Sequence, residues 1–123
     1  MSALAAPFND GLAEGRLRFQ RCQDCRHAQT LPRYACTRCG SARLAWQDAA
    51  GTGAVHAVTE VARAPSEAFR ALAPYTLVLV TLAEGPRLMA HAAPGVAIGQ
   101  RVAATFFQHH ERTLVRFMPI APP

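Results

Sequence analysis

Two C-x-x-C pairs, Cys22/Cys25 and Cys36/Cys39, constrain the fold of this 123-residue chain more than any other feature. Two thiolates three positions apart can bind one ion from a tight turn, and two such turns facing each other complete a tetrahedral site. Zinc prefers this site because it has no ligand-field bias and binds thiolate strongly. The pattern predicts that all four cysteines bind one structural Zn²⁺ ion.

The residue after each pair differs between the two turns. Gly40 follows Cys39, and a glycine there lets the backbone fold so that amide N–H groups point at sulfur. Arg26 follows Cys25 instead. We therefore expect a less ideal backbone geometry in the first turn than in the second.

Two disulfides or a one-iron centre are the alternatives to zinc. Met1 to Pro7 lack the basic region and the length of a secretory signal. We therefore expect a reducing compartment, the cytoplasm, where disulfides are rare. This expectation favours a metal over disulfides.

Few residue types remain for catalysis. A closed four-sulfur site leaves no coordination position for substrate or water, and it uses the only cysteines. All 13 basic residues are arginine, which excludes Schiff-base chemistry, lysine general bases and P-loop phosphate binding. Histidines, carboxylates and tyrosines remain, in no recognisable arrangement. We expect a protein that acts by contact rather than as an enzyme.

The formal net charge of +5 is concentrated around the cysteines. Residues 16–43 contain seven arginines and a single acid, Asp24, whereas residues 44–123 contain six arginines and five acids. Nucleic-acid binding needs a positive groove, which the nearly neutral C-terminal part does not predict. A nucleic-acid-binding module is therefore the alternative function rather than the leading one.

Short β-strands dominate the pattern after the cysteines. Residues 54–61 alternate, with Val55, Ala57, Thr59 and Val61 predicted on one face. Tyr75 to Leu82 is apolar on both faces, so we expect a central strand covered on both sides. Further strands are predicted at 16–21, 87–92, 101–107 and 112–117, with a helical turn at 66–72.

Five or more short strands at this spacing favour a small closed barrel. An OB-type Greek-key barrel of five to six strands is the first choice and an SH3-like barrel the second. The predicted fold is mainly β. The predicted parts are an N-terminal helical segment (1–15), a zinc ribbon (16–45), the barrel (46–119) and a tail (120–123).

The N-terminal segment is predicted to be a short helix from Pro7 to Glu14. Phe8 and Leu12 lie four residues apart and so share one helix face, which we expect to enter a groove on a partner. No apolar run in the chain approaches the roughly 20 residues that cross a bilayer, so no membrane partner is expected.

A series of short motifs runs through the chain in a fixed order. The series is Pro7-Phe8, Gly15-x-Leu17, the first C-x-x-C, Leu31-Pro32-Arg33, the second C-x-x-C-Gly, Gly51-x-Gly53, Thr59, Pro74-Tyr75, Glu84-Gly85-Pro86-Arg87, Gly99-x-x-Val102 and Phe117-x-Pro119. Over residues 7–119 this series resembles the DUF35 family, in which a rubredoxin-like zinc ribbon precedes an OB-fold. The chain departs from the family at Arg26, where a glycine is usual, and at Asn9, where an aromatic residue is usual.

The resemblance implies a non-catalytic accessory subunit of an enzyme of acyl-CoA metabolism. Its partner would be a thiolase-like, acyl-CoA synthase, aldolase or hydratase subunit, in a hetero-oligomer. In this family the ribbon and the N-terminal helix dock on the enzyme, and the OB-fold lies near the passage of the CoA thioester. An independent acyl-CoA hydrolase is a further alternative, although no nucleophile–base pair is visible.

Phe69, Arg70 and Tyr75 are the candidate contacts for CoA or acyl-CoA. They lie in or beside a loop joining predicted barrel strands, where OB-folds bind ligands, and an aromatic ring with an arginine can bind an adenine nucleotide. The alternative is that Phe69 simply covers the end of the barrel. The arginines at 16–43 have three interpretations: a solvated surface, a docking surface for an acidic partner, or contacts with CoA phosphates.

Overall fold

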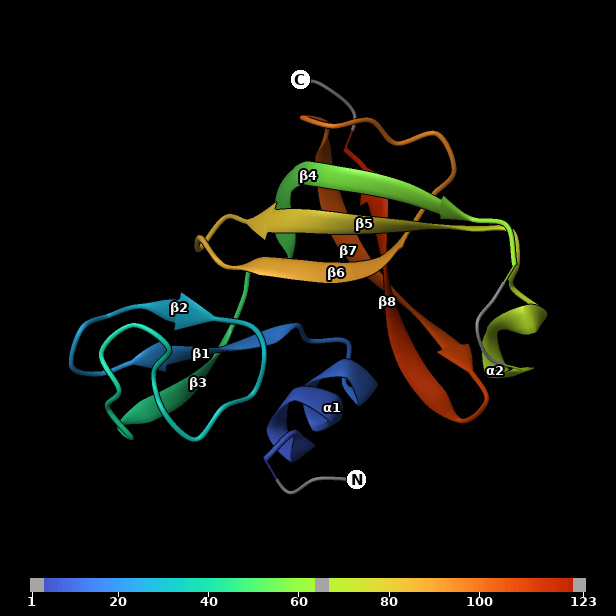
Figure 1. Cartoon of the computed structure of the whole chain (residues 1–123). Coiled ribbons are helices and arrows are strands. Elements are labelled where there is room, and N and C mark those ends of the chain that lie inside the picture. Colours follow the sequence, from blue (N-terminus) through green and yellow to red (C-terminus); the bar gives the residue numbers. More distant parts are fainter. Residues whose placement is uncertain (1–3, 64–66, 121–123) are drawn as a thin grey trace.

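The chain folds into a three-stranded sheet, a five-stranded barrel and a short helix that contacts both (Figure 1). The computed structural model describes residues 4–63 and 67–120. Helix α1 spans Ala6–Ala13, close to the predicted helix, and begins with Pro7 in its first turn, where the missing N–H costs nothing. Among the helices of these described residues, none is long and apolar enough to cross a membrane.

The three-stranded sheet carries the cysteines. Strands β1 (Arg18–Cys22), β2 (Ala28–Gln29) and β3 (Leu44–Asp48) are antiparallel in the order β2-β1-β3. β3 pairs with β1 along its whole length, from Arg18 opposite Asp48 to Cys22 opposite Leu44. The predicted division of the chain between residues 45 and 46 falls inside β3, whose pairing places all of it in the ribbon.

The second sheet closes into a barrel. Its strands are β4 (Thr52–Val61), β5 (Tyr75–Leu82), β6 (Arg87–Ala92), β7 (Arg101–His109) and β8 (Arg112–Pro119). They follow the order β4-β5-β6-β8-β7, with β7 pairing back to β4 and β6 parallel to β8. This is the five-stranded Greek-key order of an OB-fold, which confirms the predicted mainly β fold and rejects the SH3-like alternative.

The core fills the barrel and extends to α1. Val80, Val102 and Phe117 are completely buried at its centre, and Leu12 of α1 and Leu17 belong to the same cluster. Phe8 packs against this cluster as well. Leu12 is thus buried in the chain's own core and Phe8 is half-buried against it, while the entry of this helix face into a groove on a partner stays a prediction.

The strand β4 departs from simple alternation. Its register with β5 shifts between Val55 and Ala57, so His56 is an extra residue in a β-bulge. After the bulge Val58 packs against the core, whereas Ala57 and Thr59 are exposed. The predicted face of alternate residues from Val55 to Val61 is wrong because one inserted residue exchanges the two faces.

The strand β5 is covered on one side only. Thr76, Val78, Val80 and Leu82 are buried, and the alternate residues of β5 are half-buried. The prediction of a strand covered on both sides is wrong, because a barrel strand has a single interior face.

Candidate functional site

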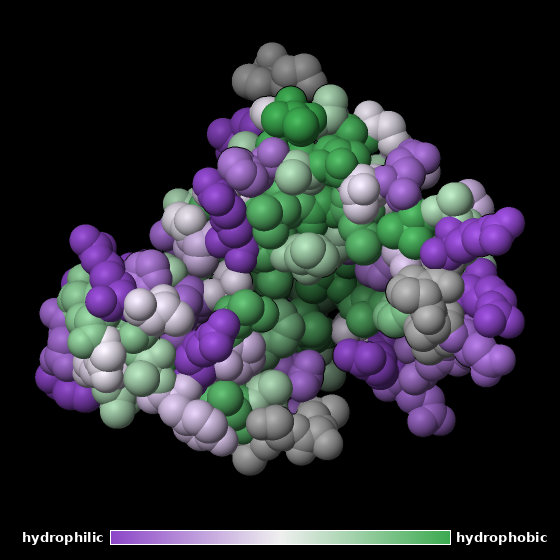
Figure 2. All heavy atoms as spheres, viewed as in Figure 1, coloured by the Kyte–Doolittle hydropathy of each residue, from purple (hydrophilic) through white to green (hydrophobic). Residues whose placement is uncertain are grey.

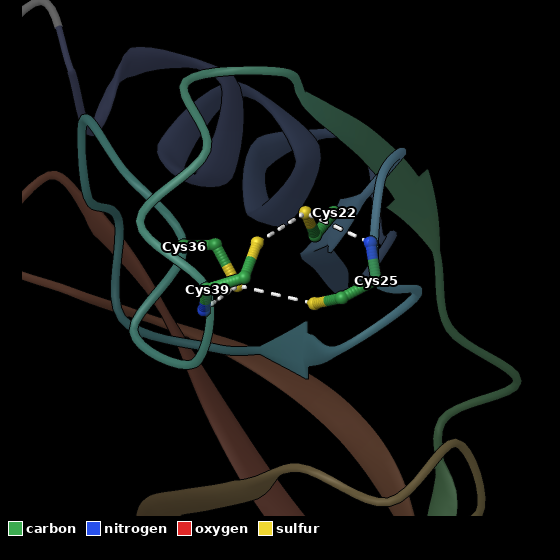
Figure 3. A group of neighbouring side chains, drawn as sticks. All are labelled: Cys22, Cys25, Cys36 and Cys39. Atoms are coloured by element: carbon green, nitrogen blue, oxygen red, sulfur yellow. Dashed lines mark hydrogen bonds between the residues drawn. The ribbon is translucent and has the colours of Figure 1, made fainter.

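All four cysteine sulfurs converge at one point between two turns (Figure 3). The sulfurs lie within 4.8 Å of one another, with 3.5 Å between those of Cys22 and Cys39 and 3.6 Å between those of Cys25 and Cys36. A regular tetrahedron with Zn–S bonds of about 2.3 Å separates its sulfurs by about 3.8 Å. The observed separations fit this tetrahedron and are far longer than a disulfide bond of about 2.05 Å.

The two turns present matching hydrogen bonds to sulfur. The N–H of Cys25 donates to the sulfur of Cys22 at 3.5 Å, and the N–H groups of Cys39 and Arg38 donate to the sulfur of Cys36 at 3.4 and 3.3 Å. The bond from Cys25 is the main cause that lowers the pKa of the Cys22 thiol to about 6. Burial acts to raise the pKa of Cys36, but these N–H bonds outweigh it and the pKa is lowered. The turns thus favour thiolates, the form that binds zinc.

The fourth sulfur shows why a cation is needed here. The N–H of Ser41 lowers the pKa of Cys39, but the sulfur of Cys22, burial, and the sulfurs of Cys25 and Cys36 together raise it to about 12. Four thiolates this close repel one another unless a positive ion lies among them. The donor set therefore fits one structural Zn²⁺ ion held by all four cysteines, which is the set that the spacing predicts.

Arg26 occupies a backbone conformation that favours glycine. Its φ is 68°, and Gly40 at the equivalent place in the second turn has φ 81°. In both turns the N–H of this residue donates to the carbonyl of the first cysteine, at 3.0 Å for Arg26 and 2.9 Å for Gly40. The first turn thus has the same geometry as the second but places an arginine where its Cβ is strained.

We expect Arg26→Gly to stabilise the metal-bound ribbon by about 0.5–1 kcal/mol. The left-handed conformation costs a non-glycine residue about 1–2 kcal/mol, and the greater freedom of glycine in the unfolded chain cancels part of this gain. Competition with a chelator for the bound metal measures the difference. Gly40→Ala is the matched control and should weaken retention, because a Cβ there meets nothing within 4 Å and adds only backbone strain. Equal retention in both variants would contradict this account.

Two buried glutamines support the second turn, and sequence reasoning missed both. Gln29 donates from Nε2 to Oε1 of Gln20 at 3.0 Å and accepts from the N–H of Thr37 at 3.0 Å. Gln20 also forms two bonds of 3.0 Å with the backbone of Arg33. Buried amides with satisfied hydrogen bonds hold a loop rigidly. The sequence offers no clear signal for either residue, because Gln20 lies between Phe19 and Arg21 and Gln29 lies between Ala28 and Thr30.

Two of the three candidate CoA contacts, Phe69 and Tyr75, belong to an aromatic cluster at one end of the barrel. Phe69 lies in α2 (Glu67–Arg70), and its ring centroid is 6.3 Å from that of Tyr75, 5.8 Å from His91 and 5.4 Å from His109. The side chain of Arg70 is 73% exposed, with its guanidinium 4.0 Å from the carboxylate of Glu67. The structure thus brings Phe69 and Tyr75 together, whereas Arg70 lies apart.

A cavity of about 390 Å³ adjoins this cluster. Tyr75, His91 and Arg116 line it, and Phe69 and Arg70 do not. The guanidinium of Arg116 lies 4.1 Å from the ring centroid of Phe107, a cation–π contact. Contact with CoA through Phe69, Arg70 and Tyr75 stays a prediction. Glu60, His91 and Arg116 also line this cavity, and sequence reasoning assigned none of the three to it.

We expect His91 to make the stability of the barrel depend on pH. Burial, then the charge of Arg116 and then that of His109, lowers the pKa of His91 below its ordinary value of 6.5. At a pH between these two pKa values the unfolded chain binds the proton and the folded chain does not. The contribution of His91 to the free energy of unfolding is therefore fully present above pH 6.5 and is lost as the pH falls below that value. Urea unfolding at pH about 7.5 and about 5.5 measures the loss. His91→Gln should reduce this pH dependence, and an unchanged dependence would contradict the assignment to His91.

Two models of known protein families match the chain, one over the ribbon and one over the barrel. The family model described as the ChsH2 rubredoxin-like zinc ribbon domain matches residues 10–45. The model described as the ChsH2 C-terminal OB-fold domain matches residues 46–107, half of the chain. The two matches meet inside β3.

Individual relatives agree with these matches. A solved structure named Ltp2-ChsH2(DUF35) aldolase is 32% identical, with a TM-score of 0.83, covering 97% of this chain and 96% of that one. A DUF35 protein of unknown function from Sulfolobus solfataricus has a TM-score of 0.69 at 15% identity, over 98% of this chain and 87% of that one, and shows the fold. A probable enoyl-CoA hydratase alpha subunit from Thermomonospora curvata is 35% identical over 87% of this chain. The chain spans about a third (34%) of that relative.

Proposed function

Because this chain belongs to the DUF35 family, in which a ChsH2-type zinc ribbon precedes an OB-fold, we propose that it is a non-catalytic accessory subunit of an acyl-CoA enzyme. Its catalytic partner is an aldolase or hydratase subunit, with which it forms a hetero-oligomer. A thiolase-like or synthase partner is less well supported, since neither word occurs in the names of the relatives.

The observation that carries the proposal is the similarity to the DUF35 chain in the aldolase structure. At 32% identity the two chains cover each other almost completely, so the likeness includes both the ribbon and the barrel. The relative named as an enoyl-CoA hydratase subunit also supports a partnership with an acyl-CoA enzyme, because its name refers to a reaction of a CoA thioester. The four cysteines add a physical argument, because a closed metal site is a rigid structural element and supplies no nucleophile.

In this proposal the chain acts by binding the catalytic subunit and carries out no chemical step itself. The metal holds the ribbon rigid for docking, and the OB-fold lies beside the passage by which the CoA thioester reaches the catalytic subunit. The cavity lined by Tyr75, His91 and Arg116 is a candidate for contact with the thioester or its nucleotide. Arginine and aromatic side chains suit a nucleotide carrying phosphates.

Co-purification tests the proposal. The tagged full chain, expressed in its source organism, should bring down one aldolase or hydratase subunit, identified by mass spectrometry and by its activity on a CoA thioester. The purified chain alone should leave the same thioester unchanged. Recovery of the chain without any acyl-CoA enzyme would overturn the proposed partnership, and turnover by the isolated chain would overturn the non-catalytic role.

A further inference from the structure

An apolar hollow lies between the ribbon, α1 and the barrel (Figure 2). It holds about 300 Å³, and the side chains that line it include Phe8 and Leu12 of α1, Leu31 of the ribbon, Met89 of β6 and Leu114 of β8. A second, more polar groove of about 400 Å³ adjoins it, and both are lined by Thr30 and Leu31. We call the two together the ribbon–barrel groove.

Large apolar side chains stand exposed on this groove. Leu31 is 63% exposed and Met89 is 67% exposed, and they come from the ribbon and the barrel respectively. Tyr34, in the same ribbon loop as Leu31, is 79% exposed. Exposed apolar residues that gather around one hollow mark a surface that another molecule covers.

The polar groove is positively charged. Three of the ribbon arginines are paired with carboxylates: Arg16 and Arg18 with Asp48, and Arg43 with Asp24. Arg33 and Arg87, by contrast, line the polar groove together, and no carboxylate is found among the described residues that line either half of the ribbon–barrel groove. The positive charge of this groove is therefore unneutralised within the described part of the chain.

The two arginines are presented from rigid backbone. Gln20, which is buried, bonds to both the N–H and the carbonyl of Arg33. The hydroxyl of Thr30 donates to the carbonyl of Arg87, tying the ribbon loop to the start of β6. A surface held in place before binding loses less conformational entropy when a partner docks.

We infer that the ribbon–barrel groove is the docking site for an amphipathic acidic segment of the catalytic subunit. The inference rests on the proposed function and names the surface and the chemistry of the partner segment. Apolar side chains of the segment fill the hollow between Leu31 and Met89, and its carboxylates pair with Arg33 and Arg87. Arginine suits this role because its planar guanidinium binds carboxylate through two hydrogen bonds.

Charge argues against a second copy of this chain as the occupant. A two-fold symmetric contact brings the same surface of both copies together. It would place Arg33 and Arg87 near their own counterparts with no carboxylate between them, and like charges across an interface are unfavourable. The groove instead complements a surface of opposite charge.

Calorimetry with the purified catalytic subunit tests the inference. Leu31→Ala/Met89→Ala should weaken binding at least about tenfold at any salt concentration, because hot-spot side chains are lost. Arg33→Glu/Arg87→Glu should weaken it at least about tenfold at low salt, and binding should then no longer fall as salt rises. The matched control is Arg63→Glu/Arg101→Glu, which makes the same charge change at exposed arginines after β4 and at the start of β7 and should bind like the unmodified chain.

The outcomes separate this inference from the proposed function. All four altered side chains are exposed, so unchanged thermal unfolding should accompany the loss of binding. Undiminished affinity in both double variants would overturn the groove while leaving the accessory role intact. If Arg63→Glu/Arg101→Glu weakened binding as much as Arg33→Glu/Arg87→Glu, the effect would come from net charge alone, and the assignment of the groove would be overturned. A dimer of the free chain that disappears in Leu31→Ala/Met89→Ala would assign the groove to a second copy. Failure of every aldolase and hydratase subunit to bind would overturn both proposals.

Discussion

Cys36→Ser should release the metal and unfold the ribbon while the barrel keeps its β structure. Cys36 is buried, and its sulfur lies 3.6 Å from that of Cys25 on the opposite turn, so its loss removes one corner of the tetrahedron. The ribbon sheet has three short strands, one of only two residues, and cannot be stable on its own. Structural zinc contributes about 10–16 kcal/mol to folding such units, so the effect should be large.

Elemental analysis and circular dichroism measure this result together. The unmodified protein should hold one zinc per chain and the variant should hold none, with part of the β signal retained. The unmodified protein stripped by a chelator is the control and should give the same spectrum as the variant. A variant that still binds one zinc would contradict the ligand assignment. Loss of the entire β signal would show that the barrel cannot fold without the ribbon.

Leu12→Ala should destabilise the barrel by about 2–4 kcal/mol. Leu12 is buried in the same cluster as Val80 and Phe117, although it belongs to a helix outside the barrel. Removing a buried leucine side chain costs the lost transfer free energy and leaves a cavity between α1 and the barrel. Denaturant unfolding followed by circular dichroism measures the change.

Leu31→Ala is the matched control for this change. It removes the same atoms from a side chain that is 63% exposed, so its effect on unfolding should stay within about 0.5 kcal/mol. Leu31→Ala should weaken partner binding more than it changes unfolding, because the Leu31 side chain is exposed on the ribbon–barrel groove, whereas Leu12 reaches the floor of the same groove almost completely buried. If Leu12→Ala left unfolding unchanged and reduced partner binding alone, α1 would be a docking helix and not part of the core.

The metal site was predictable because its information is local. Two cysteines three residues apart define a turn by themselves, and two such turns close one tetrahedron whatever the rest of the chain does. The backbone of Arg26 illustrates the same point, because the unusual residue after Cys25 adopts the left-handed conformation that the turn requires. The family and the order of ribbon and barrel were also predictable, since they depend on a long ordered series of motifs.

Predictions that assumed simple periodicity or isolated segments were less successful. One inserted residue, His56, exchanges the faces of β4, and alternation carries no signal of where a bulge lies. The amphipathic face of α1 was correctly identified, but the sequence does not show whether an apolar face packs on its own chain or on another. Phe8 and Leu12 pack on the barrel because closure of the strands leaves an apolar surface beside α1.

The sequence alone therefore determined the four metal ligands, the concentration of arginines around them and the mainly β fold. Tertiary structure decided which arginines are neutralised: Arg18 reaches Asp48, 30 residues away, while Arg33 and Arg87 converge on one groove. It also gathered Phe69, Tyr75, His91 and His109 from different elements into one cluster. Pairing and convergence depend on strand order and register over long separations, and local spacing does not specify them.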